Sequence, residues 1–266
     1  MLQPRLAATA IVARPAPDGM QVYLTRRSAR SAFAPDAFVF PGGAVDPADY
    51  DSHVQSRVNG IDEQRVRRAF RAERSPELPT TEPDIDAASA RALFVTALRE
   101  LFEETGILLT RTAAGDEREE SVDAEDPERA TVRDDARAFA TVLERRDAFA
   151  DATRLTLFSH WITPPSEGRR FNTHFFVAAV AGDRSGFADA SETHDGVWLS
   201  PAVALQRYRD GAMHLVYPTI KHLERLGGID SVDELQRFAR SKAVVTILPT
   251  GEPGRFELPP TLENAW

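Results

Sequence analysis

Cysteine is absent from this 266-residue sequence. Its absence excludes disulfide bonds, thiolate zinc sites, iron–sulfur clusters and a cysteine nucleophile. The six histidines also lack the spacing of metal-binding motifs such as H-x-H or H-E-x-x-H. No histidine is therefore assigned to a metal.

Long apolar segments and an excess of basic charge are missing as well. The longest apolar run, residues 175–181, is far too short to span a bilayer, and the N-terminal residues lack the pattern of a secretory signal. A formal net charge of -9 argues against general nucleic-acid binding, which requires a basic surface. We therefore expect a soluble, cytoplasmic protein with no nucleic-acid or membrane partner. A phosphate-bearing substrate would need local cations or a metal to overcome this charge.

The apolar pattern along the chain predicts a mixed α/β fold. Strands are expected at residues 6–13, 20–25, 38–40, 155–163, 171–180, 196–199 and 243–248. Helices are expected at residues 85–105, 134–149, 201–209, 218–226 and 232–241.

Two charged segments interrupt this pattern. Residues 46–86 contain several arginines and scattered prolines, which predicts a partly helical insertion. Residues 111–129 are acidic and poor in apolar side chains, so we expect a solvated loop or a disordered excursion with little chemistry.

The strongest functional signal is a run of carboxylates near the end of the helix expected at residues 85–105. Glu100, Glu103 and Glu104 are spaced i, i+3, i+4, so their side chains project from one side of the helix. Their repulsion costs about a few tenths of a kcal/mol per pair, and a hard divalent cation turns that cost into a binding site. The spacing therefore indicates a site for Mg²⁺ or Mn²⁺.

A glutamate-rich helix face can also be simply solvated, because glutamate is a good helix former. The glycine turn at Gly42 and Gly43 makes the metal interpretation more specific. Glycine leaves the backbone open to a metal or to a closely approaching substrate.

From Arg99 the sequence R-E-L-F-E-E-T-G-I resembles the second half of the signature of the Nudix hydrolase family, G-x5-E-x7-R-E-U-x-E-E-x-G-U. The first half departs from that signature. Counting from Gly43 places Asp49 at the position of the first glutamate, and residues 50–98 replace the seven-residue spacer.

A split signature of this kind resembles the coenzyme A diphosphatase branch of the family. The segments Leu24-Thr25-Arg26-Arg27-Ser28 and Phe40-Pro41-Gly42-Gly43 match the pattern of coenzyme A enzymes at the correct separation. Ala32 and Asp36 stand where that pattern has Arg and Gly, and Arg30 offers a replacement cation nearby.

This resemblance implies a Nudix α/β/α sandwich of α+β type with a mixed sheet. Residues 1–266 would form a single domain, with a largely helical insertion at about 50–90 and a C-terminal helical extension at about 200–242. The implied ligands of Mg²⁺ or Mn²⁺ are the carboxylates of Glu100, Glu103 and Glu104 and the carbonyl of Gly43.

The same resemblance implies roles in a hydrolytic reaction. Glu100 or Glu103 would act as the general base, with Glu192 as a possible base on a downstream loop. Arg99, one turn before Glu103, would orient that carboxylate. The substrate diphosphate would contact Arg26, Arg27, Arg30 and Gly42.

Several functions remain compatible with these residues. The first is cleavage of the diphosphate linkage of coenzyme A or acyl-coenzyme A, and the second is cleavage of ADP-ribose or NADH. A non-catalytic Nudix-like ligand sensor is a third, motivated by Asp49 and the split spacer, and an acidic scaffold for protein contacts is the last. A homodimer is also possible.

Overall fold

The structure is a computed structural model that describes residues 3–29, 34–70, 85–181, 196–263 and 266. These residues form a central mixed sheet of eight strands in the order β11-β2-β1-β10-β9-β12, with β3 paired to β2 and β4 paired to β1. The strands of this sheet are β1 (Arg5–Ala16), β2 (Gly19–Arg26), β3 (Phe38–Val39), β4 (Gly42–Ala44), β9 (Leu155–Ile162), β10 (Phe171–Ala179), β11 (Gly196–Leu199) and β12 (Thr246–Ile247).

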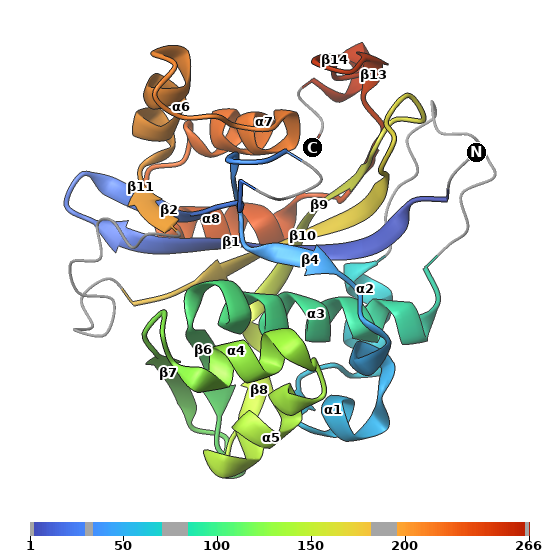
Figure 1. The fold of residues 1–266 in the computed structure, drawn as a ribbon, viewed down its shortest axis with the longest axis vertical. Coiled ribbons are helices and arrows are strands. Elements are labelled where there is room, and N and C mark those ends of the chain that lie inside the picture. The colour runs from blue at the N-terminus through green and yellow to red at the C-terminus, as the bar shows by residue number, and fades with distance from the viewer. Residues whose placement is uncertain (1–2, 30–33, 71–84, 182–195, 264–265) are drawn as a thin grey trace.

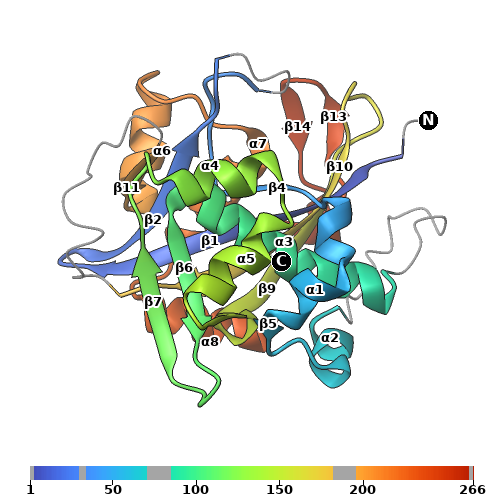
Figure 2. The same cartoon turned by 60° about the horizontal axis from the view of Figure 1, so that its bottom comes forward.

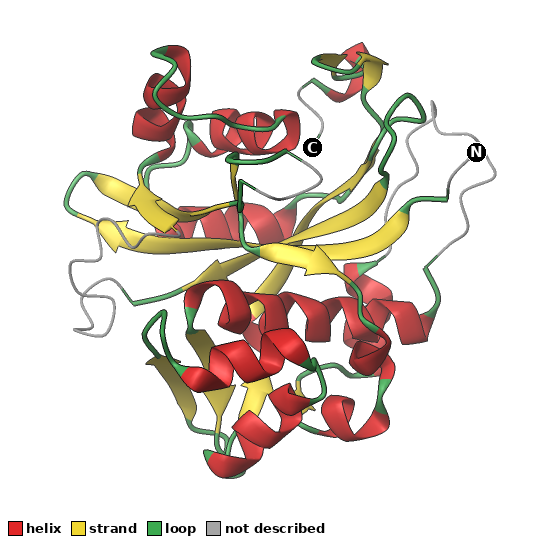
Figure 3. Cartoon of the chain, in the orientation of Figure 1, coloured by secondary structure: helices red, strands yellow, loops and turns green. Residues whose placement is uncertain are grey.

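Helices cover both faces of this sheet (Figures 1 and 3). The helices are α1 (Ser52–Ser56), α2 (Glu63–Ala69), α3 (Ala87–Thr105), α4 (Pro127–Asp134), α5 (Ala138–Arg145), α6 (Pro201–Arg209), α7 (Tyr217–Leu226) and α8 (Val232–Ser241). Short 3-10 turns lie at η1 (Pro47–Tyr50), η2 (Ala152–Arg154) and η3 (Pro260–Leu262). One core contains side chains of α3 and α5, and a second contains side chains of α7 and α8. The expected α/β/α sandwich with a mixed sheet is confirmed.

The centre of the sheet is β1, which lies parallel to β10 and is paired with β2 and β4 on its other side. From Ala7 to Ala13 of β1, six residues are no more than 4% exposed, and the seventh, Thr9, is partly exposed. This explains why the strand is apolar at nearly every position, since both of its faces are covered by helices. On that side, β2 pairs with residues 13–16 of β1 and β4 pairs with residues 7–9.

A second, smaller sheet has the order β5-β8-β6-β7. Its strands are β5 (Val58–Asn59), β6 (Ile107–Arg111), β7 (Glu117–Ser121) and β8 (Phe149–Asp151). Figure 2 shows this sheet near α4 and α5, on the side of the molecule where α3 lies. Strand β5 lies in the segment that the sequence predicted to be an insertion, so part of that segment is integrated into the fold.

The expectation of a loop at residues 111–129 was wrong. Residues 117–121 form β7, which pairs along its whole length with β6, and α4 begins at Pro127 after the capping residue Asp126. The strand was missed because its sequence, EREES, has no apolar alternation. Its acidic side chains pair with arginines instead, as in the 3.1 Å contact between Glu119 and Arg154.

The helix expected at residues 134–149 was also misplaced. The structure has α4 and α5 on either side of Asp135, and residues 149–151 form β8. The hairpin of β13 (Thr250–Glu252) and β14 (Arg255–Glu257) was not expected, because its strands are short and mostly exposed. The other predicted strands and helices are confirmed, with ends shifted by a few residues. Among the described residues, no helix is both long and apolar enough to cross a membrane.

Three buried histidines lie within the sheet and the helix above it. Burial lowers the pKa of His222 to about 3 and that of His160 to about 4, and it also lowers the pKa of His174. His222 is held between the hydroxyl of Ser159 and the carbonyl of Pro218, at 2.6 Å from each.

We predict that acid destabilises the protein through His222. Between about pH 6.5 and 3 the unfolded chain binds a proton at this residue and the folded chain does not, so stability falls by up to about 1.4 kcal/mol per pH unit as the pH is lowered. His222→Gln should reduce this slope when the melting temperature is measured from pH 7.5 to 4. The exposed His214→Gln is the control and should retain the slope; an unchanged slope in His222→Gln would refute the assignment.

Candidate active site

Helix α3 carries the carboxylates that the sequence singled out. The helix begins at Asp86, whose side chain accepts a hydrogen bond from the backbone N–H of Ser89, and it ends at Gly106. Gly106 has a φ of 75°, in the left-handed region that favours glycine at a helix end. Leu93, Leu101 and other apolar side chains are fully buried, so α3 is fixed against the sheet and its carboxylates have defined positions.

Arg99 connects three carboxylates on two separate segments of the chain. Its Nε donates to Asp49 at 2.8 Å and its Nη2 donates to the other oxygen of the same carboxylate at 3.0 Å. Its Nη1 donates to Glu100 at 2.9 Å and also to Glu103. The side chains of Arg99 and Asp49 are 4% and 0% exposed, so this paired fork is shielded from water.

Asp49 is fully satisfied in its buried position. Besides Arg99, its carboxylate accepts hydrogen bonds from the backbone N–H of Asp46 at 2.9 Å and from the hydroxyl of Thr96 at 2.7 Å. Asp49 comes immediately before the insertion and Arg99 lies in the middle of α3, 50 residues later. The ion pair therefore joins the two halves of the split signature.

The glycine strand β4 lies against the same carboxylates. The backbone N–H of Gly42 donates to Glu104 at 3.1 Å. A Cβ at Gly43 would overlap the carboxylate of Glu100, and one at Gly42 would overlap the backbone of Ala8 and Thr9 on β1. Glycine is therefore required at both positions by close approach.

Burial raises the pKa values of the three glutamates. The pKa of Glu100 rises to about 8, with Arg99 opposing the shift and the neighbouring carboxylates adding to it. The pKa of Glu104 rises to about 7, opposed by the Gly42 N–H and by Arg27. Burial also raises the pKa of Glu103, and Arg99 counteracts it. Burial alone would lower the pKa of Arg99, but the carboxylates of Asp49, Glu100 and Glu103 keep it above its usual value.

A cavity of about 490 Å³ adjoins Glu104. Its lining consists of Thr25, Arg26, Arg27, Ser28, Ala29, Asp36, Glu104, Arg129 and Arg133. Arg26 forms an exposed ion pair with Asp36 at 3.0 Å. The structure thus places two of the three arginines predicted to contact substrate beside the carboxylates, whereas Arg30 and Glu192 lie outside the described residues.

Residues 5–226 match the model of the family described as the NUDT19 Nudix domain. The chain belongs to the Nudix hydrolase family. The resemblance found in the sequence, including its coenzyme A diphosphatase branch, is confirmed, and α3 is the Nudix helix.

Relatives of this Nudix domain include named diphosphatases. The human acyl-coenzyme A diphosphatase NUDT19 is 29% identical over 256 residues, which cover 87% of this chain and 67% of the human protein. Its Xenopus laevis counterpart is 26% identical, with 84% and 64% covered. This chain spans about two thirds of the length of these relatives. A Nudix hydrolase structure from Alicyclobacillus acidocaldarius is 27% identical, with a TM-score of 0.66 and 92% and 98% of the two chains covered.

Two arginines of this Nudix site were missed by the sequence analysis. Arg129 and Arg133 lie one turn apart on α4 and both line the cavity beside Glu104. Arg129 falls at the end of the segment in which little chemistry was expected, and that expectation is corrected here. The i, i+4 spacing of the two arginines after a capping Asp126-Pro127 pair was the available signal.

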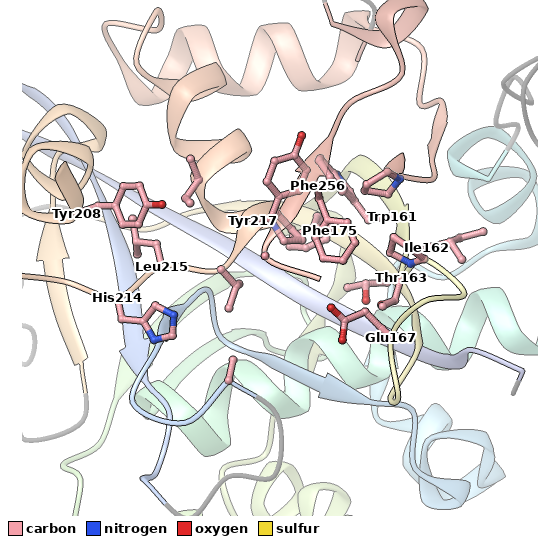
Figure 4. Close-up of a pocket in the computed structure, with 18 residues that line it drawn as sticks. Trp161, Ile162, Thr163, Glu167, Phe175, Tyr208, His214, Leu215, Tyr217 and Phe256 are labelled. Atoms are coloured by element: carbon pink, nitrogen blue, oxygen red, sulfur yellow. The ribbon is translucent and has the colours of Figure 1, made fainter. Parts of the chain in front are cut away.

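A second cavity, of about 610 Å³, is lined largely by aromatic and apolar side chains. Figure 4 shows Tyr208 and His214 on one side and Trp161 and Glu167 on the other, with the rings of Tyr217, Phe175 and Phe256 between them. One segment contributes to both cavities, since Ala34 lines this one and Asp36 lines the arginine-lined one. Leu215, in its wall, bridges to Phe38, two residues after Asp36 of the arginine-lined cavity.

We predict that Asp49→Ala lowers the free energy of unfolding by about 3–5 kcal/mol, because Arg99 then loses a buried partner. Denaturant unfolding monitored by circular dichroism measures this change. Glu144→Ala, which removes a carboxylate from an exposed pair with Arg57, is the matched control and should have a much smaller effect. Equal losses in the two variants would show that the Asp49–Arg99 pair does not hold the signature together.

A methyl group at Gly43 should disturb the site without unfolding the protein. Gly43→Ala forces the Glu100 carboxylate to move, and a displacement of about 1 Å in a catalytic site can cost about 10²-fold in rate. Steady-state hydrolysis and the melting temperature are the two measurements. Gly168→Ala is the control, because a Cβ there meets nothing within 4 Å. Full activity of Gly43→Ala would contradict the close approach of β4 to Glu100.

Proposed function

We propose that this protein is a metal-dependent diphosphatase that hydrolyses the diphosphate linkage of a nucleoside diphosphate derivative, with coenzyme A or acyl-coenzyme A as the substrate. The observation that carries the proposal is the buried Arg99–Asp49 pair. This pair positions Arg99, which in turn donates hydrogen bonds to Glu100 and Glu103. Glu104, on the same helix, accepts a hydrogen bond from the backbone N–H of Gly42 in β4.

The residues present fit a hard divalent cation. Glu100 and Glu104 are partly buried carboxylates with raised pKa values, so a cation that replaces their protons would relieve an unfavourable environment. Within the described ranges, no three histidine or acidic side chains are already arranged as a ligand cluster. We assign the ligands of Mg²⁺ or Mn²⁺ to Glu100, Glu103, Glu104 and the carbonyl of Gly43. Arg99 contacts Oε1 of Glu100 and Oε1 of Glu103, so Oε2 of each carboxylate remains for the cation.

Each side chain has a distinct part in the proposed reaction. When bound, the metal supplies neutralisation of the phosphoryl oxygens and lowers the pKa of the attacking water. Glu100 or Glu103 would accept the proton of that water as the general base. Arg99 positions Glu103, and the N–H of Gly42 positions Glu104. Glu192 remains a prediction for an additional base.

Two features support coenzyme A over other diphosphates. The arginine-lined cavity beside Glu104 offers cations to an anionic substrate. The aromatic cavity adds apolar surface for a long substrate with an uncharged arm. The human and Xenopus laevis relatives are named acyl-coenzyme A diphosphatases, which agrees with this assignment. Cleavage of ADP-ribose or NADH is the alternative enzymatic function, and a sensor without turnover is the non-enzymatic one.

We predict that Glu103→Gln abolishes hydrolysis while the fold is retained, because the neutral amide brings no negative charge to the metal and cannot act as a base. Products are identified by chromatography and mass spectrometry after incubation with Mg²⁺ or Mn²⁺ and coenzyme A, acyl-coenzyme A, ADP-ribose or NADH. The exposed Glu117→Gln is the control and should behave as the wild type.

The substrate panel separates the alternatives. Metal-dependent release of 3′,5′-ADP from coenzyme A supports the proposal. Cleavage of ADP-ribose or NADH but not of coenzyme A would refute the coenzyme A assignment and keep the diphosphatase function. Binding without cleavage of any compound would favour the sensor. Full activity of Glu103→Gln would refute the assignment of Glu103 as a metal ligand or base.

A further inference from the structure

The cavity beside Glu104 is locally basic in a protein that is acidic as a whole. Its lining has four arginines against the two carboxylates of Asp36 and Glu104, whereas the complete chain has a formal net charge of -9. Arg26 is already paired with Asp36. The excess of two arginines over the carboxylates of the lining makes the region next to Glu104 positive, and such a region attracts an anion.

The arginines of α4 differ in what they contact. Arg129 is buried, and its Nε and Nη2 donate to the carbonyl of Glu103 at 3.2 and 3.1 Å, while its Nη1 donates to the carbonyl of Asp123 at 3.1 Å. Arg129 therefore fastens α4 to the end of α3. Arg133, one turn later, is exposed and makes one long contact of 3.3 Å with the same Glu103 carbonyl.

Arg133 and Arg27 reach the cavity from two different elements. Arg27 follows β2, and its backbone N–H is held by the carbonyl of Ala37 at 2.9 Å. Both guanidinium groups act electrostatically on Glu104, which lies between the glycine strand and the cavity. An anion in the cavity would thus be next to the carboxylate site and could be bound by the forked donors of two arginines.

We propose that Arg27 and Arg133 bind a phosphate group of the substrate in this cavity, with Arg129 positioning the helix that carries Arg133. The inference rests on the proposed diphosphatase function and adds a binding residue on α4. Coenzyme A offers two sources of such a group, namely the diphosphate and the phosphomonoester on its ribose. Binding of the phosphomonoester would make the cavity a determinant of substrate choice.

Arg133→Ala tests this proposal, since the side chain is exposed and its loss does not empty the core. Arg133→Lys retains a positive charge without the fork and should be intermediate. Arg137→Ala is the matched control, because Arg137 is exposed and near in sequence, its side chain pairs with Asp135 at 3.9 Å, and it is not among the residues that line the cavity. The melting temperatures of all three variants should remain close to that of the wild type.

The first measurement is calorimetric binding of 3′,5′-ADP and of AMP in the presence of EDTA. Loss of an arginine–phosphate contact should weaken binding of 3′,5′-ADP by about 10- to 100-fold in Arg133→Ala, with no change in Arg137→Ala. This readout needs neither metal nor turnover. Equal affinity of wild type and Arg133→Ala for both nucleotides would overturn the proposal.

The second measurement is kcat/KM for coenzyme A and for 3′-dephospho-coenzyme A. A loss confined to coenzyme A in Arg133→Ala identifies the phosphomonoester as the bound group, and an equal loss for both substrates identifies the diphosphate. Unchanged values for both would refute the assignment of Arg133 while leaving the proposed function intact. If the wild type cleaves neither compound, the proposed function fails, and the calorimetry still decides whether Arg133 binds phosphate.

Discussion

The buried fork between Arg99 and Asp49 is the interaction on which the site depends. Arg99 is almost inaccessible to water and pairs with three carboxylates. The attraction to these carboxylates compensates the cost of removing the guanidinium group from water. Removing Asp49 would take away the two contacts that Arg99 makes outside α3 and leave it only Glu100 and Glu103 on its own helix, which releases the orientation of α3 relative to η1. Fold and site are therefore coupled through one side chain, which holds the helix in place and also holds two of its glutamates.

The sequence was sufficient for the parts of the fold where one physical signal dominates. Strands β1, β9 and β10 are rich in apolar residues because both sheet faces are covered, and α3 has a capping aspartate, an apolar stripe and a terminal glycine. Strand β7 could not be predicted in this way, since its residues are stabilised by backbone pairing and by ion pairs with distant arginines. Such partners are brought together only by the tertiary fold.

The same distinction applies to the site. The spacing of Glu100, Glu103 and Glu104 is local information on one helix, so it was readable from the chain, and the approach of the glycine strand agrees with it. The contribution of Arg129 and Arg133 is not local. Their helix is polar and lies after an acidic hairpin, and only its packing against the end of α3 brings these cations to Glu104.

The split between Asp49 and Arg99 has a consequence for how this domain can diverge. Loop-closure entropy rises only with the logarithm of length, by about 0.6 kcal/mol for each doubling, so a spacer of 49 residues costs roughly 1–2 kcal/mol more than one of seven. A buried ion pair of the kind formed here has a disruption cost of about 3–5 kcal/mol, which exceeds that difference. Loop-closure entropy therefore sets little limit on the length of the segment between the two residues, and what constrains that segment is its packing, as at Val58 of β5 and Leu93 of α3 in the core.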